Sequence, residues 1–133
     1  MNINSSLSHR KEEPERGVLY VVGTPIGNLS DLSPRAIHIL KNVFQIACED
    51  TRITKKIMNK FEIKTRQISF NKNNYKEKIP QIICKLKEGE TIALVSDAGM
   101  PSICDPGEEL VKLVKSKGID VICIPGACAA TTA

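Results

Sequence analysis

Residues 75–95 read YKEKIPQIICKLKEGETIALV and join two different hydrophobic patterns. From Ile79 onward, apolar residues recur at i, i+3, i+4 and i+7, which predicts one buried face of a helix over residues 75–87. Gly89 is expected to close that helix in the left-handed conformation. The apolar run at 91–95 then predicts a buried strand, so the segment has the helix–turn–strand order of an α/β fold.

The same alternation extends from this segment toward both ends of the chain. Strands are predicted at residues 18–22, 43–48, 66–70, 91–95 and 120–124, and helices at 34–41, 52–61, 75–87 and 107–117. Ser33 before Pro34 predicts an N-cap, and Gly118 is expected to close the last helix. We therefore expect an α/β domain at residues 17–133, with a largely parallel five-stranded sheet flanked by helices. Residues 1–16 are polar without periodicity and predict a disordered tail.

Composition excludes several classes of protein. The chain has 133 residues, of which 41% are hydrophobic and 26% charged, values typical of one globular domain. The longest uncharged run, residues 17–30, is too short and too rich in glycine to span a bilayer. Aromatic residues make up only 4%, with no Trp, which disfavours a base-stacking platform. Five irregularly spaced Cys and two His favour reduced thiols in the cytoplasm and no metal site.

Glycine, proline and carboxylate residues gather where the predicted strands end. In open parallel sheets, ligands bind beyond the carboxyl ends of the strands. The four loops at these ends are residues 23–29, 49–52, 96–107 and 125–126. Together they predict a ligand cleft along one edge of the sheet.

Each loop also has a purely structural interpretation. Residues 23–29 match neither a Walker A loop nor the pattern GxGxxG, so they form either an ordinary turn or a close backbone approach to a flat or sugar-bearing ligand. At residues 49–52, Asp50 or Thr51 caps the next helix, or an acidic residue serves the site while Arg52 binds phosphate. The two aspartate-containing turns within residues 96–107 favour a site over turn chemistry alone.

Charge is concentrated in residues 52–78, which hold nine basic and two acidic residues in a chain of net charge +4. On the helix predicted there, Ile53, Ile57 and Phe61 are expected to share the buried face. That leaves three residues outward: Lys55, Lys56 and Lys60. The patch is either a solvated surface or a binding site for a polyanion, and the charge asymmetry favours the second.

Four motifs in these loops resemble the tetrapyrrole methylase superfamily of class III S-adenosylmethionine-dependent methyltransferases, and within it the ribosomal RNA methyltransferases. The motifs are VGTPIGNLSD at 22–31, CEDTR at 48–52, VSDAGMP at 95–101 with DPG at 105–107, and PG at 125–126. The family pattern has a His after the third strand, whereas this sequence reads SFNKNN at 69–74. Ala-Cys also follows the final PG in place of Pro-Ser.

The resemblance implies the N-terminal half of a two-domain fold that holds S-adenosylmethionine between its domains, with the C-terminal domain absent. It implies 2′-O-methylation of a cytidine ribose in 16S rRNA of the small ribosomal subunit, with no membrane partner. Two alternatives are a precorrin-type tetrapyrrole methylase and a catalytically silent nucleotide- or RNA-binding module. The sequence leaves open whether the protein is a homodimer.

Site residues follow from the matching motifs and from the charge pattern. The resemblance assigns nine residues to the cofactor: Thr24, Pro25, Ile26, Gly27, Asp97, Ala98, Gly99, Pro125 and Gly126. The carboxylates available to remove the hydroxyl proton are Glu49, Asp50 and Asp97. The cations expected at RNA phosphates are Arg52, Lys55, Lys56, Lys60 and Lys72. No metal ligand set is expected.

Overall fold

The structure, a computed structural model, describes residues 13–24, 32–96 and 106–125. Strands and helices alternate along these residues. In chain order they are β1 (Leu19–Gly23), α2 (Pro34–Asn42), β2 (Gln45–Cys48), α3 (Thr51–Lys60), β3 (Arg66–Ser69), α4 (Tyr75–Lys87), β4 (Ile92–Ser96), α5 (Gly107–Ser116) and β5 (Val121–Ile124). Every predicted strand and helix is confirmed, with ends that differ by at most two residues.

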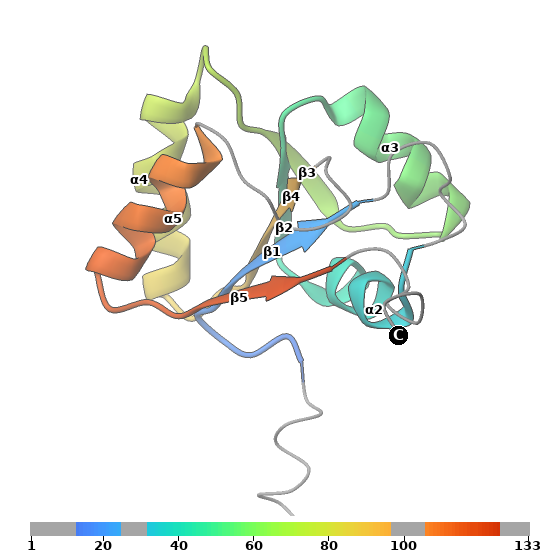
Figure 1. The fold of residues 1–133 in the computed structure, drawn as a ribbon, viewed down its shortest axis with the longest axis horizontal. Coiled ribbons are helices and arrows are strands. Elements are labelled where there is room, and N and C mark those ends of the chain that lie inside the picture. Colours follow the sequence, from blue (N-terminus) through green and yellow to red (C-terminus); the bar gives the residue numbers. More distant parts are fainter. Residues whose placement is uncertain (1–12, 25–31, 97–105, 126–133) are drawn as a thin grey trace, which may run out of the picture.

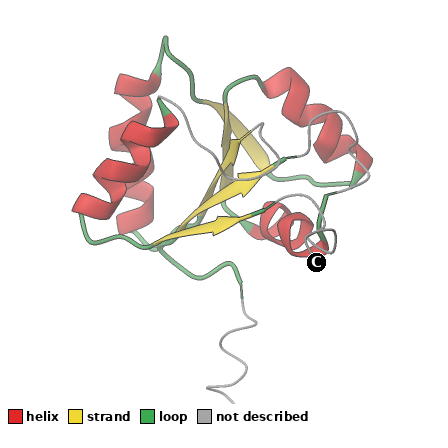
Figure 2. Ribbon diagram, viewed as in Figure 1, coloured by secondary structure: helices red, strands yellow, loops and turns green. Residues whose placement is uncertain are grey.

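The strands form one sheet in the order β3-β2-β4-β1-β5 (Figure 2). All of its pairings are parallel, as predicted. β1 pairs with β4 from Leu19 opposite Ile92 to Gly23 opposite Ser96, and its other side pairs with β5. The sheet therefore brings the carboxyl ends of all five strands to one edge, which we call the carboxyl edge.

The helices cover both faces of the sheet. From β1 through β3 the chain moves toward one side of the sheet, and from β3 through β5 it moves back. Because crossover connections between parallel strands are right-handed, this reversal places α2 and α3 on one face and α4 and α5 on the other (Figure 1). α2, which follows β1, and α5, which follows β4, therefore lie on opposite faces although the two strands are adjacent. This arrangement favours a ligand site at the carboxyl edge.

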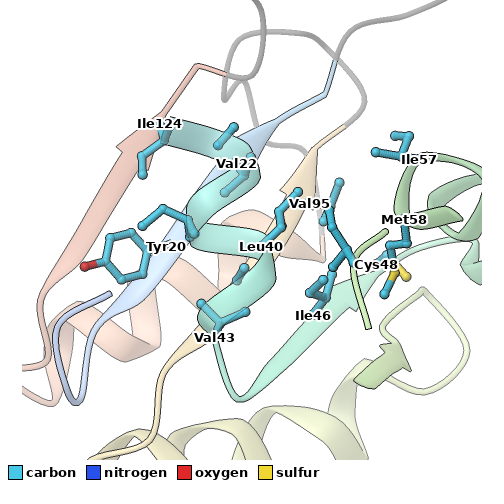
Figure 3. Close-up of a cluster of buried hydrophobic side chains, with 14 of the residues drawn as sticks. Tyr20, Val22, Leu40, Val43, Ile46, Cys48, Ile57, Met58, Val95 and Ile124 are labelled. Atoms are coloured by element: carbon cyan, nitrogen blue, oxygen red, sulfur yellow. The ribbon is translucent and has the colours of Figure 1, made fainter. Parts of the chain in front are cut away.

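Two hydrophobic clusters hold these layers together, one on each face. Tyr20 and Val22 of β1 point to the α2–α3 face, where they join Leu40 of α2 and Ile57 of α3 (Figure 3). Leu19 points the other way and packs in the cluster that contains α4 and α5. Since both faces are covered, the central strands are continuous apolar runs rather than alternating ones.

The local end signals predicted from the sequence are confirmed. The Ser33 Oγ accepts a hydrogen bond from the Ala36 N–H at 3.2 Å and caps α2. Gly89 and Gly118 have φ angles of 95° and 78°, the left-handed conformation that favours glycine.

The predicted buried face of α3 is wrong at Ile53, which is 52% exposed. Thr54 is buried instead, together with Ile57 and Met58. Thr54 lies three and four residues before those two apolar residues, so the helix geometry places it at the centre of the stripe although its side chain is polar.

Two residues before Gly17 also contact the domain that follows. Glu13 forms an ion pair with Arg35 of α2 at 2.7 Å, and its carbonyl contacts the His38 ring at 2.8 Å. The Glu15 N–H donates to the Tyr20 hydroxyl at 2.8 Å. These contacts attach the residues before Gly17 to the α2–α3 face, whereas residues 1–12 lie outside the described part of the chain.

Candidate active site

The carboxyl edge collects the loops that the sequence singled out. Gly23 at the end of β1 lies opposite Ser96 at the end of β4. β2, which leads into Glu49, pairs with β4 on its other side. Pro125 directly follows β5, which pairs with β1. The parallel register therefore brings together segments up to a hundred residues apart in the chain.

The beginnings of the first and third loops are joined by hydrogen bonds. The Thr24 N–H donates to the Ser96 carbonyl at 2.7 Å, and the Thr24 Oγ1 donates to the same oxygen at 2.9 Å. Thr24 is 3% exposed and Ser96 is 9% exposed. A buried hydrogen bond excludes competing water, so this double contact fixes where the two loops leave the sheet.

Most of the cofactor assignments lie in loops that the structure does not describe. Thr24 and Pro125 are described, and the others lie outside the described residues: Pro25, Ile26, Gly27, Asp97, Ala98, Gly99 and Gly126. Pro125 is exposed, and its carbonyl accepts a hydrogen bond from the Ser33 Oγ at 3.3 Å. The last strand is thereby linked to the start of α2 beside the first loop.

Asp50 caps α3, which confirms the structural interpretation of this residue. Its Oδ1 accepts from the Arg52 N–H at 2.9 Å, and its Oδ2 lies 3.2 Å from the Arg52 guanidinium. The side-chain hydrogen bond from Arg52 is the main cause that lowers the pKa of Asp50 below its ordinary value, and the same bond raises the pKa of Arg52. A carboxylate with a lowered pKa is a weaker base, so these contacts disfavour Asp50 as the proton acceptor.

The other predicted site residues of β2, α3 and β3 lie on the surface. Glu49 is exposed directly after β2 at the carboxyl edge, and Lys72 is exposed after β3 at the same edge. α3 runs back from this edge, so Lys60 lies about 12 Å along the helix from Arg52. The structure therefore places Arg52 and Lys72 near the edge and Lys60 away from it, with Lys55 and Lys56 between.

The loop after β3 contains a hydrogen-bond network that the sequence reasoning missed. The Asn74 Nδ2 donates to the Ser69 Oγ at 2.7 Å, and the Asn74 Oδ1 accepts from the Asn71 N–H at 2.9 Å. The Asn71 Oδ1 accepts in turn from the Asn73 N–H at 2.8 Å. The available signal was the spacing of the three Asn residues, because Asn side chains commonly bind backbone groups a few residues away.

Two neutral polar residues are buried at the carboxyl edge. In the described part of the chain, no three His, Cys, Asp or Glu side chains gather as a metal site. Four polar side chains are buried there, and two of them, Thr24 and Ser96, meet at the edge between β1 and β4. A neutral, anchored pair flanked by glycine- and proline-rich loops suits a ligand that contacts backbone groups closely.

The family model for Tetrapyrrole (Corrin/Porphyrin) Methylases matches residues 18–133, which is nearly the whole chain. The chain belongs to the tetrapyrrole methylase family. The match includes all five strands and every loop at the carboxyl edge. The family resemblance drawn from the motifs is therefore confirmed.

Curated relatives in this family carry the name ribosomal RNA small subunit methyltransferase I. The protein from Halalkalibacterium halodurans is 54% identical over 123 residues, which cover 92% of this chain and 43% of the relative. The protein from Escherichia coli O157:H7 is 46% identical over 125 residues, which cover 94% of this chain and 44% of the relative. The chain thus spans less than half the length of these relatives.

Solved structures of tetrapyrrole methylases share the fold. The uroporphyrin-III-C-methyltransferase from Thermus thermophilus aligns with a TM-score of 0.66 and 21% identity, over 86% of this chain and 49% of that one. The cobalt precorrin-4 methyltransferase CbiF aligns with a TM-score of 0.69 and 18% identity, over 85% and 47%. At these identities the likeness supports the fold alone, and it confirms the predicted α/β fold class. No helix among the described residues is long and apolar enough to cross a membrane.

Proposed function

We propose that this tetrapyrrole methylase domain serves an S-adenosylmethionine-dependent methyltransferase that modifies ribosomal RNA of the small subunit, at the ribose 2′-hydroxyl of a cytidine in 16S rRNA. The observation that carries the proposal is the 54% identity with a relative named as a methyltransferase of small subunit ribosomal RNA, against 21% with a methylase named for a porphyrin. The partner is then the small ribosomal subunit, and the place of action is the cytoplasm.

The carboxyl edge is the proposed cofactor site. Thr24 anchors the first loop to Ser96, which directly precedes the loop that begins with Asp97. Pro25, Ile26 and Gly27, then Asp97, Ala98 and Gly99, and finally Pro125 and Gly126 would line the cofactor. Glycine and proline in these positions let the backbone approach a ribose or adenine ring without an intervening long side chain.

The proposed reaction would form a bond between a ribose oxygen and a methyl carbon as the bond from that carbon to sulfur breaks, and the sulfur would leave as a neutral thioether. When bound, S-adenosylmethionine supplies a methyl group activated by its positively charged sulfur. The residues of this chain hold the acceptor hydroxyl in line with that carbon, and a carboxylate removes the hydroxyl proton. Because Asp50 caps α3 and binds Arg52, we assign proton removal to Glu49 or Asp97.

The exposed lysines of α3 and the loop after β3 form the proposed RNA side. Lys55, Lys56 and Lys72 are exposed and take no part in the ion pairs of the described residues. Unpaired cations beside the site favour a polyanionic substrate. Arg52 would contribute once a phosphate competes with Asp50 for its guanidinium.

The test measures methyl transfer by the natural, full-length protein. Purified small ribosomal subunits are incubated with methyl-tritiated S-adenosylmethionine, and the RNA is digested to nucleosides. The proposal predicts label in 2′-O-methylcytidine and a large loss of label for Asp97→Ala, but none for the exposed control Glu108→Ala. Label in a tetrapyrrole acceptor instead, or cofactor binding without transfer to either substrate, would overturn the proposal in favour of one of the two alternatives.

A further inference from the structure

The basic residues of segment 52–78 surround the outer strand of the sheet. β3 is the last strand on its side, α3 packs beside it on one face, and α4 begins beyond its carboxyl end. We define the β3-edge band as the eight basic residues of positions 55–78, which come from α3, β3, the first turn of α4 and the loops that join them. They are Lys55, Lys56, Lys60, Lys64, Arg66, Lys72, Lys76 and Lys78.

The cations of this band have no acidic partners. The ion pairs of residues 13–24, 32–96 and 106–125 are Arg35–Glu13, Arg52–Asp50 and Lys85–Glu88, and none of them uses a band residue. The same segment has only two acidic residues, Glu62 and Glu77, and both are exposed. A row of unneutralised cations attracts a polyanion over a wide area.

The opposite side of the molecule does not share this bias. On α5, Lys112 and Lys115 are balanced by Glu108 and Glu109. The positive charge is therefore a local property of the β3 edge and not a general feature of the surface.

None of the five Phe and Tyr side chains of the chain is exposed beside the band. The chain has five aromatic residues, and all of them are described. Tyr20 and Phe70 are buried, and Phe61 and Tyr75 are half-buried against the two hydrophobic clusters. Phe44 is 38% exposed, but it precedes β2 at the opposite edge and lies under the Lys85 ammonium at 5.4 Å. Proteins that bind unpaired strands usually stack successive bases on aromatic side chains.

We propose that the β3-edge band binds the phosphate backbone of base-paired RNA and not unpaired bases, an inference that rests on the proposed RNA substrate. β3 spans about 10 Å from Arg66 to Ser69, and Lys64 and Lys72 lie beyond its two ends, so the band can follow more than one phosphate of a rigid helix. Double-stranded RNA is recognised largely through its shape and its backbone, which needs cations at fixed positions and no stacking ring. The band has this composition.

The test compares two labelled RNAs of equal charge by fluorescence anisotropy in the absence of cofactor. One is a hairpin with a stem of about 16 base pairs, and the other is an unpaired strand of the same number of nucleotides. We expect the hairpin to bind several-fold more tightly. The combined variant Lys64→Gln, Arg66→Gln, Lys76→Gln should weaken hairpin binding at least fivefold and lower its salt slope by about 2 to 3, since each lost phosphate contact removes nearly one unit.

The matched control is Lys112→Gln with Lys115→Gln on α5, which should leave hairpin affinity within twofold of the wild type. If the unpaired strand binds more tightly than the hairpin, or if Tyr75→Leu abolishes RNA binding, the RNA is held by stacking and the inference is overturned. An equal loss in the control variant would also overturn it. Methyl transfer is measured in a separate assay, so the two proposals can fail independently. If the variants of the band bind RNA like the wild type, the proposed reaction is unaffected. If a tetrapyrrole is labelled, the measured RNA binding is unaffected.

Discussion

At the carbonyl oxygen of Ser96, two hydrogen bonds from Thr24 join the ends of β1 and β4. Neither residue is charged, and both are buried, so the contact persists whatever the pH or ionic strength. Single residues of this kind set the geometry of the carboxyl edge. Asp50 does the same for the start of α3.

The Thr24 hydroxyl can be removed almost without a change of volume. We expect Thr24→Val to lower the free energy of unfolding by about 1 kcal/mol, because one hydrogen bond is lost while the backbone N–H still donates to Ser96. It should also weaken S-adenosylmethionine binding several-fold, as measured by calorimetry. Thr24→Ser keeps the hydroxyl and should restore both quantities, whereas unchanged cofactor affinity in the valine variant would remove Thr24 from the site.

Gly17 and Gly118 provide a matched pair for backbone strain. Both have positive φ, at 70° and 78°, but a Cβ at Gly17 would lie 3.2 Å from the Leu86 carbonyl, while nothing lies within 4 Å at Gly118. Urea unfolding should show a loss of about 1 kcal/mol for Gly118→Ala, from the left-handed conformation alone. Gly17→Ala should lose more, and equal losses would mean that Gly17 is there only for its φ angle.

The ion pair between Glu13 and Arg35 makes stability depend on acid. The hydrogen bond from Arg35 is the main cause that lowers the pKa of Glu13 below its ordinary value of 4.5. A lowered pKa in the folded state stabilises the protein above pH 4.5, and that contribution is lost as the pH falls through the folded value. We therefore expect the free energy of unfolding to fall less steeply below pH 5 in Arg35→Gln than in the wild type, as followed by urea titration at several pH values. Arg66→Gln, an exposed residue in no ion pair of the described residues, serves as the control and should keep the wild-type slope.

At the level of single elements, α3 combines three functions in ten residues. Asp50 caps its first turn, Thr54 and Ile57 pack on the sheet, and Lys55 and Lys56 face outward. The outward lysines contribute nothing to the packing, so their charge can be removed without loss of the fold.

The salt dependence of RNA binding tests whether these lysines contact phosphate. We expect Lys55→Ala and Lys56→Ala each to lower the magnitude of the slope of log K against log salt by about 0.7 to 0.9, because a variant with one phosphate contact fewer releases fewer counterions when it binds. Cofactor affinity should not change. Slopes equal to that of the wild type would show that this face of α3 is only solvated, and RNA would then have to bind elsewhere.

The positions of the elements could be predicted because each carries a strong local signal. The stripe that begins at Ile79 identified α4, and the glycine after it marked the turn into β4. The face of α3 was predicted wrongly because Ile53, Ile57 and Phe61 also follow helical spacing, while the polar Thr54 in the buried stripe gives no hydrophobic signal. The tie between Thr24 and Ser96 is a contact between residues 72 positions apart, and no local pattern predicts such a contact.

For the candidate site, the sequence predicted that the carboxyl ends of the strands meet at one edge but not how they are held there. That prediction succeeded because parallel strands place their carboxyl ends together whatever the side chains are. The roles of Asp50 and Arg52 were left open, since a cap and a catalytic carboxylate use the same residue types. The Asn network after β3 was not predicted, because the sequence SFNKNN at 69–74 does not show which backbone groups its Asn side chains bind.

For the whole molecule, the strand order explains why one edge carries the site. The chain reverses direction after β3, so its helices cover both faces, and the carboxyl ends of its parallel strands lie at one edge (Figure 1). The basic β3 edge then lies at one side of the sheet, and the neutral Thr24–Ser96 contact lies near its middle. Cofactor and RNA backbone are thereby assigned to separate, neighbouring surfaces.

The central claim is that S-adenosylmethionine binds at the carboxyl edge beside β1 and β4. It is tested most directly by titrating the cofactor into the isotope-labelled 133-residue chain and following the backbone amide signals by NMR. We expect the largest shifts at Gly23, Thr24 and Ser96, and none at Gly17, Phe44 or Gly118, which lie beside the opposite ends of the strands. Shifts centred on that opposite edge, or no shifts at any cofactor concentration, would contradict it.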